Sequence, residues 1–198
     1  MNPLHLGPDV VQRLIPHRRP FLMVDAVEAL EVGDKPALRA SRLVTANEPV
    51  FEGHFPGLHL WPGVYTIEGL GQTCNLLLVL LAMQEDHGEP SEVLAALEHL
   101  ERCLTLRPHD ARIVETVSTR LAARPRGWNL GMSAAVQVKL VRPVFAGQRL
   151  DYEVRRTHQH DTLVRFDVEA SVSGQRVAQG TMTSALSIGS LPGGGSDA

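Results

Sequence analysis

Residues 62–83 have the sequence PGVYTIEGLGQTCNLLLVLLAM, which predicts one long helix. Proline is favoured in the first turn of a helix, and no further proline follows until Pro90. The second half of the stretch is apolar on every side, and a helix tolerates this when neighbouring elements cover most of its circumference. We therefore expect this helix to lie in the middle of the fold.

The composition is that of one folded globular domain. The chain has 198 residues, of which 43% are hydrophobic and 21% are charged. A net charge of −3 lacks the positive field with which proteins collect nucleic-acid phosphates, so no nucleic-acid partner is expected. The apolar run Leu76–Met83 is far shorter than the roughly 20 residues that cross a bilayer, so no membrane partner is expected either.

The first residues show no secretory signal, and the default compartment is the cytoplasm. The two cysteines, Cys74 and Cys103, lack a metal-binding or redox spacing. We expect both to be reduced thiols in the core.

Strand patterns flank the long helix. Before it, residues 21–27 and 38–45 predict an antiparallel pair. After it, Ser91 is a candidate cap for a second, amphipathic helix with an apolar stripe, and further strand candidates follow at 112–120, 134–144, 150–156, 163–170 and 176–186. This order predicts an α+β domain over residues 1–188, in which an antiparallel sheet covers a helix. Residues 189–198 should form a disordered tail.

The loop before the long helix and the helix itself supply candidate chemistry. His54 lies among glycines and prolines, and Glu68 lies about one and a half turns into the helix. An imidazole and a buried carboxyl can act as base and acid near neutral pH, and N–H groups at Gly63 and Val64 could polarise a carbonyl oxygen. The structural alternative is that His54 only bonds to backbone and that Glu68 only favours the helix dipole.

Residues 44–72, with GHFPG at 53–57, PGV at 62–64 and then Glu68, resemble the signature of the 3-hydroxyacyl-[acyl-carrier-protein] dehydratases. Residues 15–25 and 139–150 resemble two further motifs of the same family. The resemblance implies a hot-dog fold, in which a long antiparallel sheet wraps around a central helix. It also implies a homodimer, or a trimer of such dimers, with sheets that continue across the dimer interface.

The same resemblance assigns roles to individual residues. His54 and Glu68 match the catalytic pair, supplied to each site by opposite subunits, and Gly63 and Val64 match the positions beside the thioester carbonyl. The expected substrate is a 3-hydroxyacyl chain on acyl carrier protein, in fatty-acid or polyketide/polyene-type biosynthesis, and no metal or other cofactor is needed. The remaining expected substrate-binding residues are Phe55, Gly57, Trp61 and Gly69.

The sequence departs from the family pattern at three places. Residues 58–61 differ at the approach to the site, Gly69 and Gly71 stand where alanines are common, and residues of about 85–130 form an apparent insertion with helical character. The two glycines indicate either close packing or space for the acyl chain. The altered approach and the insertion leave substrate choice open.

Two alternative functions remain at this stage. Hot-dog domains also include thioesterases, because a fold does not fix a chemistry, and a non-catalytic acyl-binding subunit is a further possibility. Near the late strands, Lys139, Arg142 and Arg149 are candidates to meet an acidic carrier protein. His158 and His160 have metal-ligand spacing, but we interpret them as solvent-exposed because no third ligand is near in the sequence.

Overall fold

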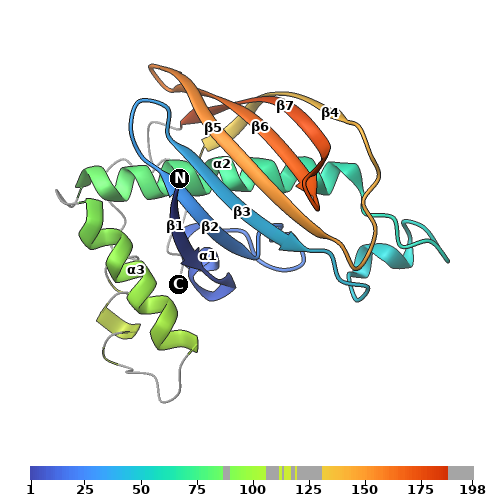
Figure 1. The fold of residues 1–198 in the computed structure, drawn as a ribbon, viewed down its shortest axis with the longest axis horizontal. Coiled ribbons are helices and arrows are strands. Elements are labelled where there is room, and N and C mark those ends of the chain that lie inside the picture. Colours follow the sequence, from blue (N-terminus) through green and yellow to red (C-terminus); the bar gives the residue numbers. More distant parts are fainter. Residues whose placement is uncertain (87–89, 106–111, 113, 117–118, 120–130, 187–198) are drawn as a thin grey trace, which may run out of the picture.

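The computed structural model describes residues 1–86, 90–105, 112, 114–116, 119 and 131–186. Seven antiparallel strands form one sheet that curves around the long helix α2, Gly63–Asp86 (Figure 1). The strand order is β1-β2-β3-β5-β6-β7-β4. The strands are β1 (Asn2–Leu6), β2 (Ala26–Glu31), β3 (Ala37–Leu43), β4 (Gly131–Leu140), β5 (Arg149–His160), β6 (Leu163–Val172) and β7 (Gln175–Leu186).

Alternation along β5 shows how the sheet faces the helix. Leu150, Tyr152 and Val154 are buried, while the charged residues between them are intermediate or exposed. Because side chains of a strand alternate between its two faces, one face of β5 packs on α2 and the other faces outward. The apolar alternation predicted a half-buried strand here, and that prediction is confirmed.

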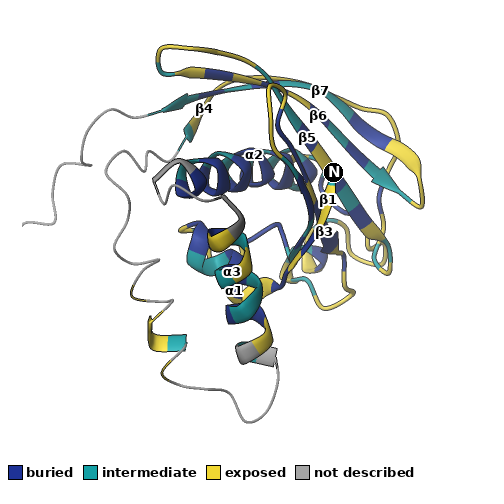
Figure 2. Cartoon of the chain, turned by 60° about the vertical axis from the view of Figure 1, so that its left-hand side comes forward, coloured by how far each residue is buried: buried dark blue, intermediate teal, exposed yellow. Residues whose placement is uncertain are grey.

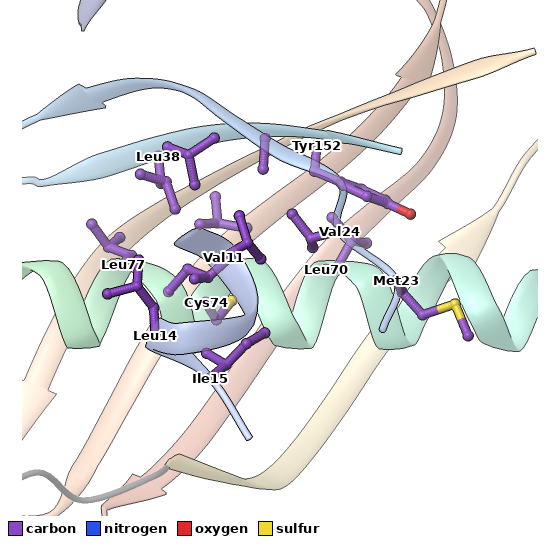
Figure 3. Close-up of a cluster of buried hydrophobic side chains, with 14 of the residues drawn as sticks. Val11, Leu14, Ile15, Met23, Val24, Leu38, Leu70, Cys74, Leu77 and Tyr152 are labelled. Carbon is purple, nitrogen blue, oxygen red and sulfur yellow. The ribbon is translucent and has the colours of Figure 1, made fainter. Parts of the chain in front are cut away.

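Helix α2 occupies the centre of the domain. Leu70, Cys74 and Leu77 are fully buried in a cluster with side chains of α1 (Pro8–Leu14), β3 and β5 (Figure 3). By length and composition, residues Gly63–Gln84 could cross a membrane, yet 67% of their apolar window is buried inside the domain. The core helix of a globular domain has these same properties.

Helices α1 and α3 (Pro90–Thr105) lie on the side of α2 that the sheet leaves open (Figure 2). The predicted stripe of α3 is confirmed, since Val93, Leu97 and Leu100 are buried in the common core. The Gly7 N–H also donates to the Glu101 carboxylate at 2.8 Å, which ties α3 to the start of α1. The helix of the apparent insertion is therefore part of the main core.

Several sequence predictions were wrong in detail. The first expected strand begins only at Ala26, because backbone groups of residues 21–23 bond to a side chain of α2 instead of to a sheet neighbour. Residues 112–120 were expected as a strand, whereas the described ones among them are helical. Ser91 was expected to precede the second helix, but α3 begins at Pro90, so Ser91 lies within it.

The remaining elements were either missed, left undescribed or found with shifted ends. Strand β1 and helix α1 were not predicted. The expected disordered tail, 189–198, lies outside the described residues, as does part of the apparent insertion. The late strands at 134–144, 150–156, 163–170 and 176–186 are present as β4 to β7, with shifted ends.

Candidate active site

His54 follows a short 3-10 helix, Pro49–Glu52, in the loop that leads to α2. Its backbone N–H donates to the Val50 carbonyl at 2.9 Å, and its ring Nδ1 lies 2.8 Å from the Leu60 carbonyl oxygen. A carbonyl oxygen only accepts hydrogen bonds, so in the neutral ring Nδ1 carries the proton and Nε2 has the lone pair. The loop therefore presents His54 as a base.

A pocket of about 350 Å³ lies beside the His54 ring. Its lining includes Gly63, the first residue of α2, together with apolar side chains from β4 and the loops around it. A Cβ at position 63 would meet the end of the exposed Leu140 side chain, which would have to move aside. The first N–H groups of an α-helix have no partner within the helix and lie at the positive end of its dipole. The pocket thus combines a base with a site suited to an oxygen that gains negative charge.

The loop that carries His54 is fixed by a buried arginine. Arg42 of β3 contacts Asp25 at 2.7 Å and Glu48 at 2.5 Å, and its guanidinium lies 5.9 Å from the centre of the Trp61 ring. Trp61 itself is buried and lines the pocket. These contacts connect the loop on both sides of His54 to the end of β3.

Glu68 is held by a side chain one helical turn further on. Gln72 Nε2 donates to Glu68 Oε1 at 2.9 Å and to the Phe21 carbonyl at 2.7 Å, and Gln72 Oε1 accepts from the Met23 N–H at 2.8 Å. Because both ends of this buried amide are bound, it holds the carboxylate in one orientation. His17 Nε2 lies 3.5 Å from the same Glu68 oxygen.

The two predicted catalytic residues lie in different surroundings of a single chain. Glu68 is not among the described residues that line the pocket beside His54. Within the part of the chain that the structure describes, no hydrogen bond or ion pair joins the two side chains. Within a single chain, His54 and Glu68 therefore do not share one pocket.

The other expected substrate-binding residues fall into two groups. Gly63 and Trp61 line the pocket, and Phe55 stacks on the His54 ring with 4.2 Å between the ring centres. Gly57 has φ +80°, a conformation that favours glycine, and Val64 is exposed at the start of α2, outside the described lining. Their contacts with a substrate stay predictions.

Gly69 provides room for a neighbour. A Cβ at this position would meet the Tyr152 ring, which packs fully buried between β5 and α2 (Figure 3). Burial raises the pKa of the Tyr152 hydroxyl, which has no hydrogen-bond partner among the described residues. Of the two interpretations of this glycine, the structure favours close packing over open space for an acyl chain.

The remaining charged candidates differ in their surroundings. Arg149 is engaged with Glu28 at 3.0 Å and Asp151 at 2.8 Å, whereas Arg142 lies at the pocket that holds His54. His158 and His160 are exposed on β5 as expected. Among the described residues no group of three or more His, Cys, Asp or Glu side chains is arranged to hold a metal ion.

Sequence reasoning missed two partners of Glu68. Gln72 stands four residues after Glu68, the spacing at which helix side chains meet, and this spacing could have revealed it. The second partner is His17. Its contact with Glu68 joins residues 51 positions apart in sequence and depends on the fold.

The comparisons with known proteins agree with the expected family and fold. The FabA-like domain matches residues 15–127. The chain is 38% identical over 116 residues to the 3-hydroxyacyl-[acyl-carrier-protein] dehydratase FabZ of Clostridioides difficile (strain 630), covering 59% of this chain and 78% of that protein. It is 33% identical over 172 residues to the FabZ dehydratase of Anaeromyxobacter sp. (strain Fw109-5), covering 86% and 84%.

A solved structure shares the architecture. A chain of the dehydratase heterocomplex ApeI:P from Xenorhabdus doucetiae superimposes with a TM-score of 0.55 at 18% identity, covering 90% of this chain and 91% of that one. The fold is the α+β hot-dog fold, which confirms the expected class. The chain belongs to the FabA-like domain family, and its similarity to the FabZ dehydratases extends over most of its length.

Proposed function

We propose that this protein is a hydro-lyase that removes water from 3-hydroxyacyl thioesters on acyl carrier protein and forms trans-2-enoyl thioesters. The observation that carries the proposal is His54, whose Nδ1 is held by the Leu60 carbonyl while the ring lies in a pocket with the N-terminus of α2. Family membership and the FabZ relatives support the same reaction. The product would enter fatty-acid or polyketide/polyene-type biosynthesis.

In the proposed reaction each group performs one step. His54 Nε2 takes the proton from the carbon next to the thioester, and the thioester oxygen accepts hydrogen bonds at the N-terminus of α2. Glu68 protonates the departing hydroxyl as its C–O bond breaks, so that the electron pair of the C–H bond becomes the new double bond. The Gln72 amide holds Glu68 in the required orientation.

We propose that two copies of the chain complete each site. Strand β4 forms one edge of the sheet, and its exposed apolar residues include Met132, Val136 and Leu140. An exposed apolar edge strand is suited to pairing with another chain. The end of this strand also lines the pocket of His54, so a second copy docked along β4 is well placed to bring its own Glu68 to that pocket.

The carrier protein is proposed to dock beside Arg142, at the mouth of the same pocket. We expect the carrier protein to be acidic, so the positive charge of Arg142 would attract it. Such charge complementarity chiefly raises the rate and specificity of encounter. Arg142 also bonds to Gln175, which holds its guanidinium at the surface.

A product assay tests the reaction. The protein is incubated with a 3-hydroxyacyl thioester of acyl carrier protein, and the acyl group is followed by mass spectrometry. We expect the loss of one water molecule, and the addition of water when an enoyl thioester is supplied instead. Release of a free acid would indicate a thioesterase, and an unchanged thioester would indicate a non-catalytic acyl-binding subunit; either result contradicts the proposal.

A further inference from the structure

His17 lies in the segment between α1 and β2, against the acid of the proposed reaction. Its Nε2 is 3.5 Å from Glu68 Oε1, and its ring stacks on Phe21 with 6.5 Å between ring centres. Its side chain keeps 22% of its surface exposed, while its Nδ1 is buried and has no hydrogen-bond partner among the described residues. The ring thus contacts both the Glu68 carboxylate and solvent.

The proposed reaction leaves Glu68 without its proton after every turnover. Its other side-chain partner, Gln72, is an amide that donates a hydrogen bond but does not give up a proton. Arg18 lies beside His17 and bonds to the carbonyls of Ile15 and His17, and a guanidinium stays protonated throughout the working range of pH. Glu68 keeps 30% of its own side chain exposed to solvent, and among the side chains described in contact with it, His17 is the one that can exchange a proton.

The surroundings of His17 couple its charge to that of Glu68. The pKa of His17 is lowered on balance, because burial lowers it more than the negative charge of Glu68 raises it, and the positive charge of Arg18 lowers it further. His17 therefore binds a proton most readily when Glu68 is a carboxylate, which is its state just after the hydroxyl has left. Once Glu68 is neutral again, this attraction disappears.

We propose that His17 is a proton relay that reloads Glu68 between turnovers. The imidazolium Nε2–H bond breaks as an O–H bond forms on Glu68, and the neutral ring then takes a proton from water. No electrons are transferred, and the proton that His54 removed from substrate returns to solvent separately. His17 Nε2 and Glu68 Oε1 are 3.5 Å apart, so the two groups must move slightly closer before the proton is transferred. Catalytic hydrogen bonds are commonly this long in the absence of substrate. The relay rests on the proposed function, because it requires Glu68 to be the acid.

A His17→Gln variant tests the relay, because an amide keeps a hydrogen-bonding side chain that cannot carry a proton. We expect kcat to fall about 10-fold or more, while KM and the melting temperature stay close to wild type. His158→Gln, which changes an exposed histidine on β5, is the matched control and should behave as wild type. Turnover is measured from about pH 5.5 to 9, which spans the titration of histidine.

Rescue separates a relay from a structural role. In a His17→Ala variant at fixed pH, turnover should rise with the concentration of added imidazole, whereas wild-type turnover should not. The relay would be overturned if His17→Gln had an unchanged kcat at every pH. It would also be overturned if kcat and melting temperature both fell and imidazole did not rescue His17→Ala.

Glu68→Gln is assayed alongside to separate the two proposals. If Glu68→Gln keeps wild-type turnover, the acid of the proposed function is wrong and the relay falls with it. If Glu68→Gln is inactive and His17→Gln is fully active, the relay alone is wrong.

Discussion

The two long helices of the molecule pack in opposite ways. Helix α2 is enclosed by the sheet on one side and by α1 and α3 on the other, and it carries Glu68 and the pocket-lining Gly63 (Figure 2). Helix α3 buries only one stripe and is anchored through Glu101 to the start of α1. The difference teaches that the enclosed helix carries residues of the proposed site, whereas the outer helix contributes buried apolar side chains to the core. Substitutions in the two helices should therefore have separable effects.

The largest effect is expected on α2. Glu68→Gln should lower turnover by at least about 100-fold, because positioned acid and base groups contribute 10²–10⁴-fold. The variant should fold normally, since amide and carboxyl have similar shapes. Turnover of a 3-hydroxyacyl carrier-protein thioester and circular dichroism check the two statements. Near-normal turnover would remove Glu68 from the chemistry.

A change in α3 should act on stability instead. Leu100 is fully buried, so Leu100→Ala should cost about 2–5 kcal/mol in the free energy of unfolding, measured by urea denaturation. Turnover per folded molecule should stay near wild type. The exposed Glu92 on the same helix provides the control, and Glu92→Gln should cost about 1 kcal/mol at most. If Leu100→Ala cost as little as the control, α3 would not belong to the core.

The two glycines of α2 offer a finer comparison within one helix. A Cβ at Gly69 would meet the rigid Tyr152 ring, so Gly69→Ala should destabilise by about 1–3 kcal/mol. At Gly71 a Cβ would lie 3.3 Å from the flexible end of Met182, so Gly71→Ala should be neutral or gain up to about 1 kcal/mol of helix propensity.

Tyr152→Leu should relieve part of the cost of Gly69→Ala, which a double-mutant cycle in thermal or urea unfolding detects. Losses of activity in Gly69→Ala should be equal for short and long acyl chains. A loss confined to long or branched chains would restore the alternative in which Gly69 opens acyl space.

The smallest effect is expected at the surface. Arg142→Ala should raise KM several-fold for a carrier-protein substrate and should change it little for a small thioester mimic, because rim charges act mainly on encounter. Steady-state kinetics with both substrates, at low and high salt, make the comparison. Equal changes with both substrates would place Arg142 at the acyl group and not at the carrier.

The enclosed helix and the late strands could be predicted from sequence, whereas the roles of His54 and Glu68 stay predictions. Apolar residues on all sides of residues 76–83 indicated the central helix, and the alternation along 150–156 indicated a half-buried strand. The stripe of α3 was visible for the same reason. These elements carry their burial pattern within a short window of sequence.

The elements that were missed depend on distant partners. Strand β1 is five residues long and, among the described strands, pairs with β2, about 25 positions away, so its own sequence gives little signal. Residues 112–120 contain several β-branched residues, yet the described ones are helical because local β propensity is weak. The contact of His17 with Glu68 arises only when the chain has folded.

Mixing two inactive variants tests the central claim that His54 and Glu68 form one acid/base pair supplied by two copies. In a mixed dimer of His54→Ala and Glu68→Ala chains, one site carries both defects and the other is wild type in composition. With random exchange at equal concentrations about half the dimers are mixed, so roughly a quarter of all sites should regain activity. We expect co-refolded variants to recover about a quarter of wild-type dehydration, while neither variant alone approaches this rate. No recovery in chains shown to have mixed would contradict the shared site.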